Sequence, residues 1–264
     1  MQAIAFLNSV MSDNTQRFSN RVDNYVKYRP SYPQQIISFL EESIEFNKNF
    51  IVADIGSGTG IFTELFLENG NMAYAIEPNE PMRNKAEALL KHYPLFKSIN
   101  GTAEQTMLPN KSVDIITAAQ SFHWFDTNKT KAEFKRILKD KAYCMLAWNE
   151  RVIESAFEKA YEQLLFEYAT DYSKVDHKNI NEDKIAAFFG SHHLIKQTFT
   201  NKQVFNFEGL KGRLLSSSYA PDENHPIHNA MIEKLNYIFE TFNQNNSVEF
   251  KYETKLYIGK LSES

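Results

Sequence analysis

The chain has 264 residues, of which 42% are hydrophobic and 23% are charged, and its net charge is −4. This size and composition suit one large globular domain with at most a modest insertion. The charge excludes a strongly basic surface, so we expect no nucleic-acid partner. The sequence contains no apolar stretch long enough for a bilayer and no signal-peptide pattern. We therefore expect a cytoplasmic protein without a membrane partner, and no pattern indicates the oligomeric state.

In chain order, residues 1–33 form an N-terminal arm, in which Pro30 and Pro33 disfavour helix just before them. Short apolar runs then alternate with amphipathic stretches, and each kind predicts its own element. We expect strands at 50–55, 72–77, 96–100, 113–119 and 142–148, and helices at 34–46, 61–70, 79–92 and 127–139. This alternation predicts an α/β fold with a parallel sheet and helices on both faces. In such sheets, ligands bind beyond the carboxyl ends of the strands.

The pattern changes after residue 150. We expect helices at 153–169, 184–190 and 226–243, strands at 200–207 and 248–261, and a loop or short helix at 209–219. The predicted division of the chain is therefore an arm (1–33), a nucleotide-binding core (34–150), a lid that also completes the sheet (151–225), and a final helix and strand of the core (226–264). The single cysteine, Cys144, lies in an apolar run and should be buried.

The most informative segment is VADIGSGTG, residues 52–60, between a predicted strand and a predicted helix. Glycines at such a turn let the backbone pass close to a ligand. Glu77 ends the next strand, where a carboxylate can bind both hydroxyls of a ribose. A dinucleotide dehydrogenase would carry its third glycine at position 61, but this residue is Ile61. Asp54 would repel a diphosphate and attract an ammonium group.

The motifs as a set resemble class I S-adenosylmethionine (SAM)-dependent methyltransferases. VADIGSGTG and YAIEPNEPMR look like the first two motifs of that family. GTAEQTMLPNKSVDIITAAQSFHWFD, residues 101–126, and FSNRVDNYVKYRPSYP, residues 18–33, are similar to segments of the ubiquinone/menaquinone-biosynthesis and trans-aconitate methyltransferase-like group. The resemblance covers about residues 18–150. It implies a Rossmann-like, mostly parallel seven-stranded sheet with an antiparallel final strand and a lid from the arm and the C-terminal insertion.

The resemblance also implies SAM as the cofactor and S-adenosylhomocysteine as the product, with a small-molecule acceptor as the partner. Glu77 would bind the ribose, Asp54 the ammonium group and Arg29 the carboxylate. The full set of implied cofactor-binding residues is Tyr28, Arg29, Asp54, Gly56, Ser57, Gly58, Thr59, Gly60, Glu77, Pro78, Met82, Thr102, Ala103, Glu104 and Gln120.

Methyl transfer from a sulfonium needs alignment and exclusion of water more than it needs protein chemistry. Aromatic faces stabilise a cation, and the candidate rings are Tyr25, Tyr28, Phe122 and Trp124. His123 is the candidate catalytic base, or else it orients a substrate oxygen, and Trp124 is the second candidate catalytic residue.

A carboxylate acceptor would need a cation instead of a base, and either Arg151 or Arg213 could supply it. Both arginines could equally be solvated surface residues. The run SSSYAP, residues 216–221, either lines the acceptor pocket or forms a loop whose serines bond their own backbone.

Two histidine pairs, His192–His193 and His225 with His228, lie in polar segments without other ligands at suitable spacing. We therefore expect no metal and place these histidines at the surface. Two other functions stay open at this stage. One is a nicotinamide-dependent oxidoreductase on a related fold, and the other is a SAM-binding protein without catalytic activity.

Overall fold

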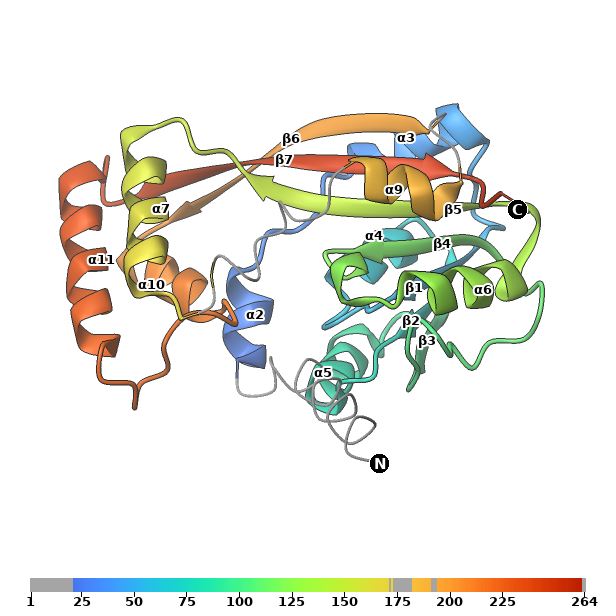
Figure 1. Cartoon of the computed structure of the whole chain (residues 1–264), viewed down its shortest axis with the longest axis horizontal. Helices are drawn as coiled ribbons and strands as arrows, with labels where there is room; N and C mark the ends of the chain where they lie inside the picture. Colours follow the sequence, from blue (N-terminus) through green and yellow to red (C-terminus); the bar gives the residue numbers. More distant parts are fainter. Residues whose placement is uncertain (1–20, 171, 173–181, 191–193, 263–264) are drawn as a thin grey trace.

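The computed structural model describes residues 21–170, 172, 182–190 and 194–262. Its centre is a seven-stranded sheet in the order β3-β2-β1-β4-β5-β7-β6 (Figure 1). The strands are β1 (Ile51–Ile55), β2 (Met72–Ile76), β3 (Phe96–Ile99), β4 (Val113–Ala119), β5 (Leu138–Arg151), β6 (Ile195–Phe205) and β7 (Val248–Gly259). The first five strands pair in parallel, and β7 lies antiparallel between β5 and β6. This confirms the predicted mostly parallel sheet with an antiparallel final strand.

Helices cover both faces of this sheet. One face packs on α3 (Gln35–Ile44) and α4 (Ile61–Glu68), with α5 (Glu80–Leu90) beside them. The other face packs on α6 (Thr127–Ile137) and α9 (Glu182–Phe189). Side chains that alternate along β1 separate the two cores, because Val52 enters the first and Ala53 enters the second. The predicted helices on both faces are therefore confirmed.

A third core lies beyond the edge of this three-layered body. It contains α7 (Ala156–Tyr168), α10 (Phe207–Leu215) and α11 (His228–Phe242), and it uses the far ends of β6 and β7. Along one face of β7, Leu256 and Ile258 enter the core under α3, whereas Phe250 and Tyr252 enter the third core. Figure 1 shows the long strands β6 and β7 reaching from one body to the other.

The N-terminal arm joins this third core. Helix α2 (Val22–Tyr28) lies beside α10, and a Cβ on Gly212 would come within 2.0 Å of the Tyr28 ring. The Arg21 guanidinium donates to the carbonyl oxygens of Ser217 and Ala220. We call α2, α7, α10 and α11, together with residues 216–220, the cap. The cap thus combines segments that lie almost 200 residues apart in the chain.

Strands β5 and β6 and helix α10 differ most from the sequence prediction. Strand β5 runs from Leu138 to Arg151, longer than the predicted 142–148, because its ends pair with the two neighbouring strands β4 and β7. Strand β6 begins at Ile195, and the segment predicted as a loop or short helix is the helix α10. Polar residues at the start of β6 hide its alternation, because it is an edge strand with every second residue exposed or half-exposed.

Candidate cofactor and acceptor site

A cavity of about 470 Å³ opens between the carboxyl ends of β1, β2, β4 and β5 and the cap. Its size is in the range of small-molecule sites. Most residues predicted to bind cofactor or substrate line it: Arg29, Asp54, Gly56, Ser57, Gly58, Glu77, Pro78, Met82, Thr102, Ala103, Glu104, Gln120, His123 and Trp124. The topology therefore gathers at one place a set that the sequence spreads over almost 100 residues.

The glycine-rich turn between β1 and α4 shows why each glycine stands where it does. Gly56, Gly58 and Gly60 all have positive φ, which disfavours other residues. A Cβ on Gly56 would lie 2.6 Å from Ser121 Cβ, and one on Gly60 would lie 2.5 Å from Leu90 Cδ1. A Cβ on Gly58 would meet nothing within 4 Å. Gly56 and Gly60 thus serve packing, whereas Gly58 faces the open cavity.

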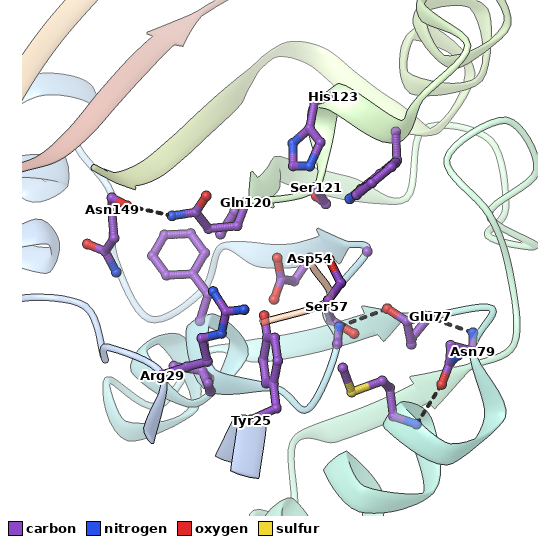
Figure 2. Close-up of a pocket in the computed structure, with 18 of the residues that line it drawn as sticks. Tyr25, Arg29, Asp54, Ser57, Glu77, Asn79, Gln120, Ser121, His123 and Asn149 are labelled. Carbon is purple, nitrogen blue, oxygen red and sulfur yellow. Dashed lines mark hydrogen bonds between the residues drawn. The ribbon is translucent and has the colours of Figure 1, made fainter. Parts of the chain in front are cut away.

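Glu77 follows β2 and is held at both carboxylate oxygens. Its Oε2 accepts from the backbone N–H of Gly58 at 2.8 Å, and its Oε1 accepts from that of Asn79 at 2.8 Å (Figure 2). Burial raises the pKa of this carboxyl, while the two N–H groups oppose the rise by stabilising the charged form. Each oxygen keeps a further lone pair for a ligand hydroxyl.

Asp54, at the carboxyl end of β1, is only 1% exposed. Its oxygens accept from the hydroxyls of Thr63 at 2.6 Å and Thr117 at 3.0 Å. Burial raises the pKa of Asp54 to about 6, although these hydrogen bonds oppose the rise. The group therefore changes charge close to neutral pH, and a cation beside it would favour its ionised form.

Gln120 ends β4 in a left-handed conformation, with φ of 56°. Its Nε2 donates to the carbonyl oxygen of Asn149 at 2.9 Å, which fixes the amide (Figure 2). Its Oε1 is buried and has no hydrogen-bond partner among the described residues, and the same holds for Ser57 Oγ. Buried polar atoms are normally satisfied, so a ligand with donors suits this part of the cavity.

Residues at the start of α5 form another wall of the cavity. The Asn79 side chain accepts from the Met82 N–H at 3.0 Å and so caps the helix, with Pro78 just before it. Thr102, Ala103 and Glu104 line the cavity from the loop after β3. Glu104 also accepts from the backbone N–H of Asp126 at 3.0 Å, which ties this loop to the start of α6.

His123 and Trp124 lie on the short 3-10 helix Phe122–Trp124 after β4. Both line the cavity, and their ring centroids are 4.6 Å apart. The Ser121 hydroxyl donates to the Ile55 carbonyl at 2.7 Å and ties this loop to the end of β1. The candidate base is therefore held over the glycine-rich turn by neighbouring strand ends.

Four residues named from the sequence do not line the cavity. Tyr28 packs on Gly212 and on the edge of Phe205, whereas Tyr25, one turn earlier in α2, lines the cavity in its place. Thr59 and Gly60 belong to the turn but face the protein interior on the side away from the cavity. Phe122 is buried in the core, 4.7 Å from the Phe188 ring.

The cap end of the cavity carries arginines. Arg29, Arg151 and Arg213 all line it, as do Tyr172 and Tyr219. The sequence had left Arg151 and Arg213 open as solvated surface residues, and this alternative is wrong. Arg213 is 5% exposed, and the Arg151 side chain is 12% exposed. Figure 2 shows Arg29 and Glu77 on either side of the Tyr25 ring.

Asn149 and Tyr172 are among the lining residues for which the sequence predicted no role. The Asn149 side chain donates to the Ser31 carbonyl at 3.3 Å and accepts from the Thr254 hydroxyl, so it links the arm, β5 and β7. Its position just beyond the predicted end of a central strand was the available signal. Tyr172 lies in a polar segment without periodicity, and no sequence signal marked it.

Some expectations concern features outside this cavity. Cys144 is buried, as predicted. His228 was placed at the surface, but it is 7% exposed and its Nδ1 lies 3.0 Å from the Pro221 carbonyl oxygen. His192 and His193 lie outside the described residues. Within the described ranges, no His, Cys, Asp or Glu residues group as a metal site, and no helix is long and apolar enough to cross a membrane.

An α/β sheet of this order, with a glycine-rich turn after β1 and an acidic residue after β2, defines a Rossmann-like nucleotide-binding protein. Comparison with known proteins narrows the class. Residues 53–146 match the family model described as a methyltransferase domain. An uncharacterized methyltransferase from Mycobacterium tuberculosis is 33% identical over 139 residues, which cover 53% of this chain and 54% of the relative. One from Schizosaccharomyces pombe is 26% identical over 203 residues, covering 76% of this chain and 77% of the relative.

Solved structures share the fold. The YcgJ protein from Bacillus subtilis superposes with a TM-score of 0.54 at 18% identity, covering 87% of this chain and 100% of the other. An N-methyltransferase from Haemonchus contortus was solved in complex with phosphomonomethylethanolamine and S-adenosylhomocysteine. It superposes with a TM-score of 0.55 at 12% identity, covering 95% of this chain and 59% of the other. The chain spans about half the length of the first curated relatives that it matches.

Residues 53–146 thus match a methyltransferase domain, and the relatives and the neighbour with bound S-adenosylhomocysteine support SAM as the cofactor of this domain. The narrower likeness to the ubiquinone/menaquinone-biosynthesis and trans-aconitate methyltransferase-like group stays a prediction.

Proposed function

We propose that the protein transfers the methyl group of SAM to a small-molecule acceptor by in-line displacement. The observation that carries the proposal is the turn itself. Gly58 leaves open space, its N–H fixes the Glu77 carboxylate, and Asp54 and Gln120 Oε1 present acceptors in the same cavity. A ligand with ribose hydroxyls and an ammonium group matches these acceptors, whereas a diphosphate would face Asp54.

In this proposal the sheet end of the cavity holds the cofactor. Glu77 binds the ribose hydroxyls, and Asp54 with Gln120 Oε1 binds the ammonium group. Arg29 binds the carboxylate. Pro78 and Met82 flank the adenine, and Thr102, Ala103 and Glu104 meet its edge. The residues that the structure places behind the turn, Thr59 and Gly60, support its shape instead.

The bound cofactor supplies the electrophilic methyl group. The chain's own residues then align the acceptor and exclude water. Trp124 and Tyr25 present aromatic faces, which favour a neighbouring cation. His123 accepts a proton from a neutral nucleophile or orients a substrate oxygen. The cap, which combines α2 of the arm and parts of residues 151–225 with α11, acts as the lid that closes over the acceptor.

Calorimetry with the whole chain tests this proposal. S-adenosylhomocysteine should bind and NAD should not. Binding of NAD without S-adenosylhomocysteine would instead support the oxidoreductase alternative, since the two ligands share an adenosine but differ in the diphosphate. If S-adenosylhomocysteine binds but no acceptor from a broad metabolite panel is methylated, a SAM-binding protein without catalysis is the better description.

A further inference from the structure

Three guanidinium groups meet at the cap end of the cavity, and their partners differ. Arg151 pairs with Glu162 at 2.5 Å and donates to the Tyr172 hydroxyl at 2.9 Å. That cation is therefore neutralised within the cap. Among the described residues, neither Arg29 nor Arg213 has a carboxylate within 4.0 Å.

Arg213 has only neutral partners in the part of the chain that is described. Its Nε donates to the Tyr252 hydroxyl at 3.3 Å, and its Nη1 donates to the Ser217 hydroxyl at 3.3 Å. Both bonds are long, and Nη2 makes none with a described residue. An unpaired cation buried this deeply is costly. Since Arg213 lines the cavity, its remaining N–H groups are available to a ligand.

Arg29 is the second cation without an acidic partner. Its Nη2 donates to the Ser216 carbonyl at 3.0 Å, and its buried Nε has no hydrogen-bond partner among the described residues. Burial lowers the pKa of Arg29, and repulsion from Arg213 lowers it further. The two guanidinium groups are thus close enough to affect each other.

The pKa of Tyr219 also reflects the positive charge of these arginines. Burial alone would raise the pKa of its phenol, but the charges of Arg151, Arg213 and Arg29 hold the pKa below its ordinary value. The other carboxylate near this end, Glu150, is engaged by Lys255 at 2.6 Å. The described part of the cap end therefore carries an excess of two positive charges.

We propose that Arg213 is the anchor for a carboxylate on the methyl acceptor, so that the substrate is a small organic acid. This inference rests on the proposed function, in which Arg29 takes the carboxylate of the cofactor. One cation then remains, and a monoanion balances it, whereas a phosphate monoester would bring a second negative charge. The rings of Tyr172 and Tyr219, which contact each other and line the cavity, can enclose the apolar part of such an acid.

The test uses the smallest carboxylate, so that the shape of the unknown acceptor plays no part. The whole chain is saturated with S-adenosylhomocysteine, and the ¹⁹F line of trifluoroacetate is followed in wild type, R213Q and R213K. Trifluoroacetamide is the neutral probe. K202Q is the matched control, since it removes a positive charge from the exposed pair Lys202–Glu249, and neither residue lines the cavity.

We expect wild type and K202Q to bind trifluoroacetate, with acetate displacing it. R213Q should weaken this binding at least tenfold, R213K should retain part of it, and the affinity for S-adenosylhomocysteine should stay within about twofold. Equal binding of trifluoroacetamide, or equal binding of trifluoroacetate by R213Q, would overturn the inference. So would displacement by methyl phosphate at a tenth of the acetate concentration. If S-adenosylhomocysteine itself does not bind to wild type, the proposed function fails instead.

Discussion

The sheet end of the cavity and its cap end differ in charge and in construction. At the sheet end, Asp54 and Glu77 are acidic, and hydrogen bonds hold both: hydroxyls on α4 and β4 donate to Asp54, and backbone N–H groups of two turns donate to Glu77. At the cap end, Arg29 and Arg213 are basic and have neutral partners from distant segments. This contrast suits two ligands of opposite character. A cationic sulfonium cofactor with an ammonium group fits the first end, and an anionic acceptor fits the second.

Removal of the Glu77 carboxylate at the sheet end should have the largest effect on cofactor affinity. Glu77→Ala should weaken S-adenosylhomocysteine binding on the order of 100-fold, because it removes two charged acceptors and leaves the N–H groups of Gly58 and Asn79 without theirs. Calorimetry measures this change, with the exposed Glu87→Ala as control. A loss below about threefold would contradict a ribose site at Glu77.

The two glycines of the turn separate folding from binding. Gly60→Ala should lower the free energy of unfolding by about 2 to 3 kcal/mol, because its Cβ would strike Leu90 and its φ is 85°. Gly58→Ala should cost about 1 kcal/mol, but it should weaken S-adenosylhomocysteine binding about tenfold by filling ligand space. Chemical denaturation and calorimetry give both quantities. Equal effects of both variants on binding would show that Gly58 does not face the ligand.

Gly212→Ala tests how the arm closes the cap end. The added Cβ would overlap the Tyr28 ring, so α2 should be displaced from α10, with a loss of about 1 to 2 kcal/mol in the free energy of unfolding. Limited proteolysis should cut the arm sooner in this variant than in Glu208→Ala, which changes an exposed residue of the same helix. Identical arm cleavage in the two variants would argue against the observed docking.

The pH dependence of cofactor binding tests whether the Asp54 carboxylate attracts the ammonium group of the ligand. Its pKa is about 6 in the ligand-free protein, so the carboxylate is ionised above this pH and protonated below it. Affinity for S-adenosylhomocysteine should be constant above pH 7 and fall up to about tenfold towards pH 5, as the attraction to the ammonium group is lost. Calorimetry across this range measures the change. Asp54→Asn should give a weaker and flatter profile, and an equally steep one would assign the titration to another group.

The smallest effect on cofactor affinity should come from His123→Ala, because His123 faces the acceptor in this account. S-adenosylhomocysteine should bind within about twofold of wild type, far from the loss expected for Glu77→Ala. Once an acceptor is identified, turnover should fall if that acceptor is a neutral nucleophile. Unchanged turnover with such an acceptor would remove the proposed role as base.

The two ends also differ in how far the sequence could predict them. The sheet end follows from local patterns, since the glycine turn, Glu77 and the loop after β4 each lie next to a strand that periodicity reveals. The cap end is assembled from residues such as Arg21 and Ala220, which periodicity cannot bring together. Whether Arg213 is a surface residue or a buried one depends on the third core, and this core forms only because β6 and β7 extend past the parallel strands of the sheet.

Contacts with distant segments also decide which rings of the arm face the cavity, and the sequence could not predict this. The motif in residues 18–33 pointed to Tyr28 as a cofactor residue, but the packing of α2 against Gly212 turns this ring away and brings Tyr25 to the cavity. Helical spacing alone could not decide which face of α2 is covered, because the covering helix α10 lies far along the chain.

A crystal structure of the complex with S-adenosylhomocysteine tests the division of the cavity most directly. We expect the ribose hydroxyls on the Glu77 carboxylate, the ammonium group beside Asp54, and the sulfur directed towards the space between Trp124 and the cap arginines. A nucleoside bound at the cap end, with Glu77 making no contact to it, would contradict the account.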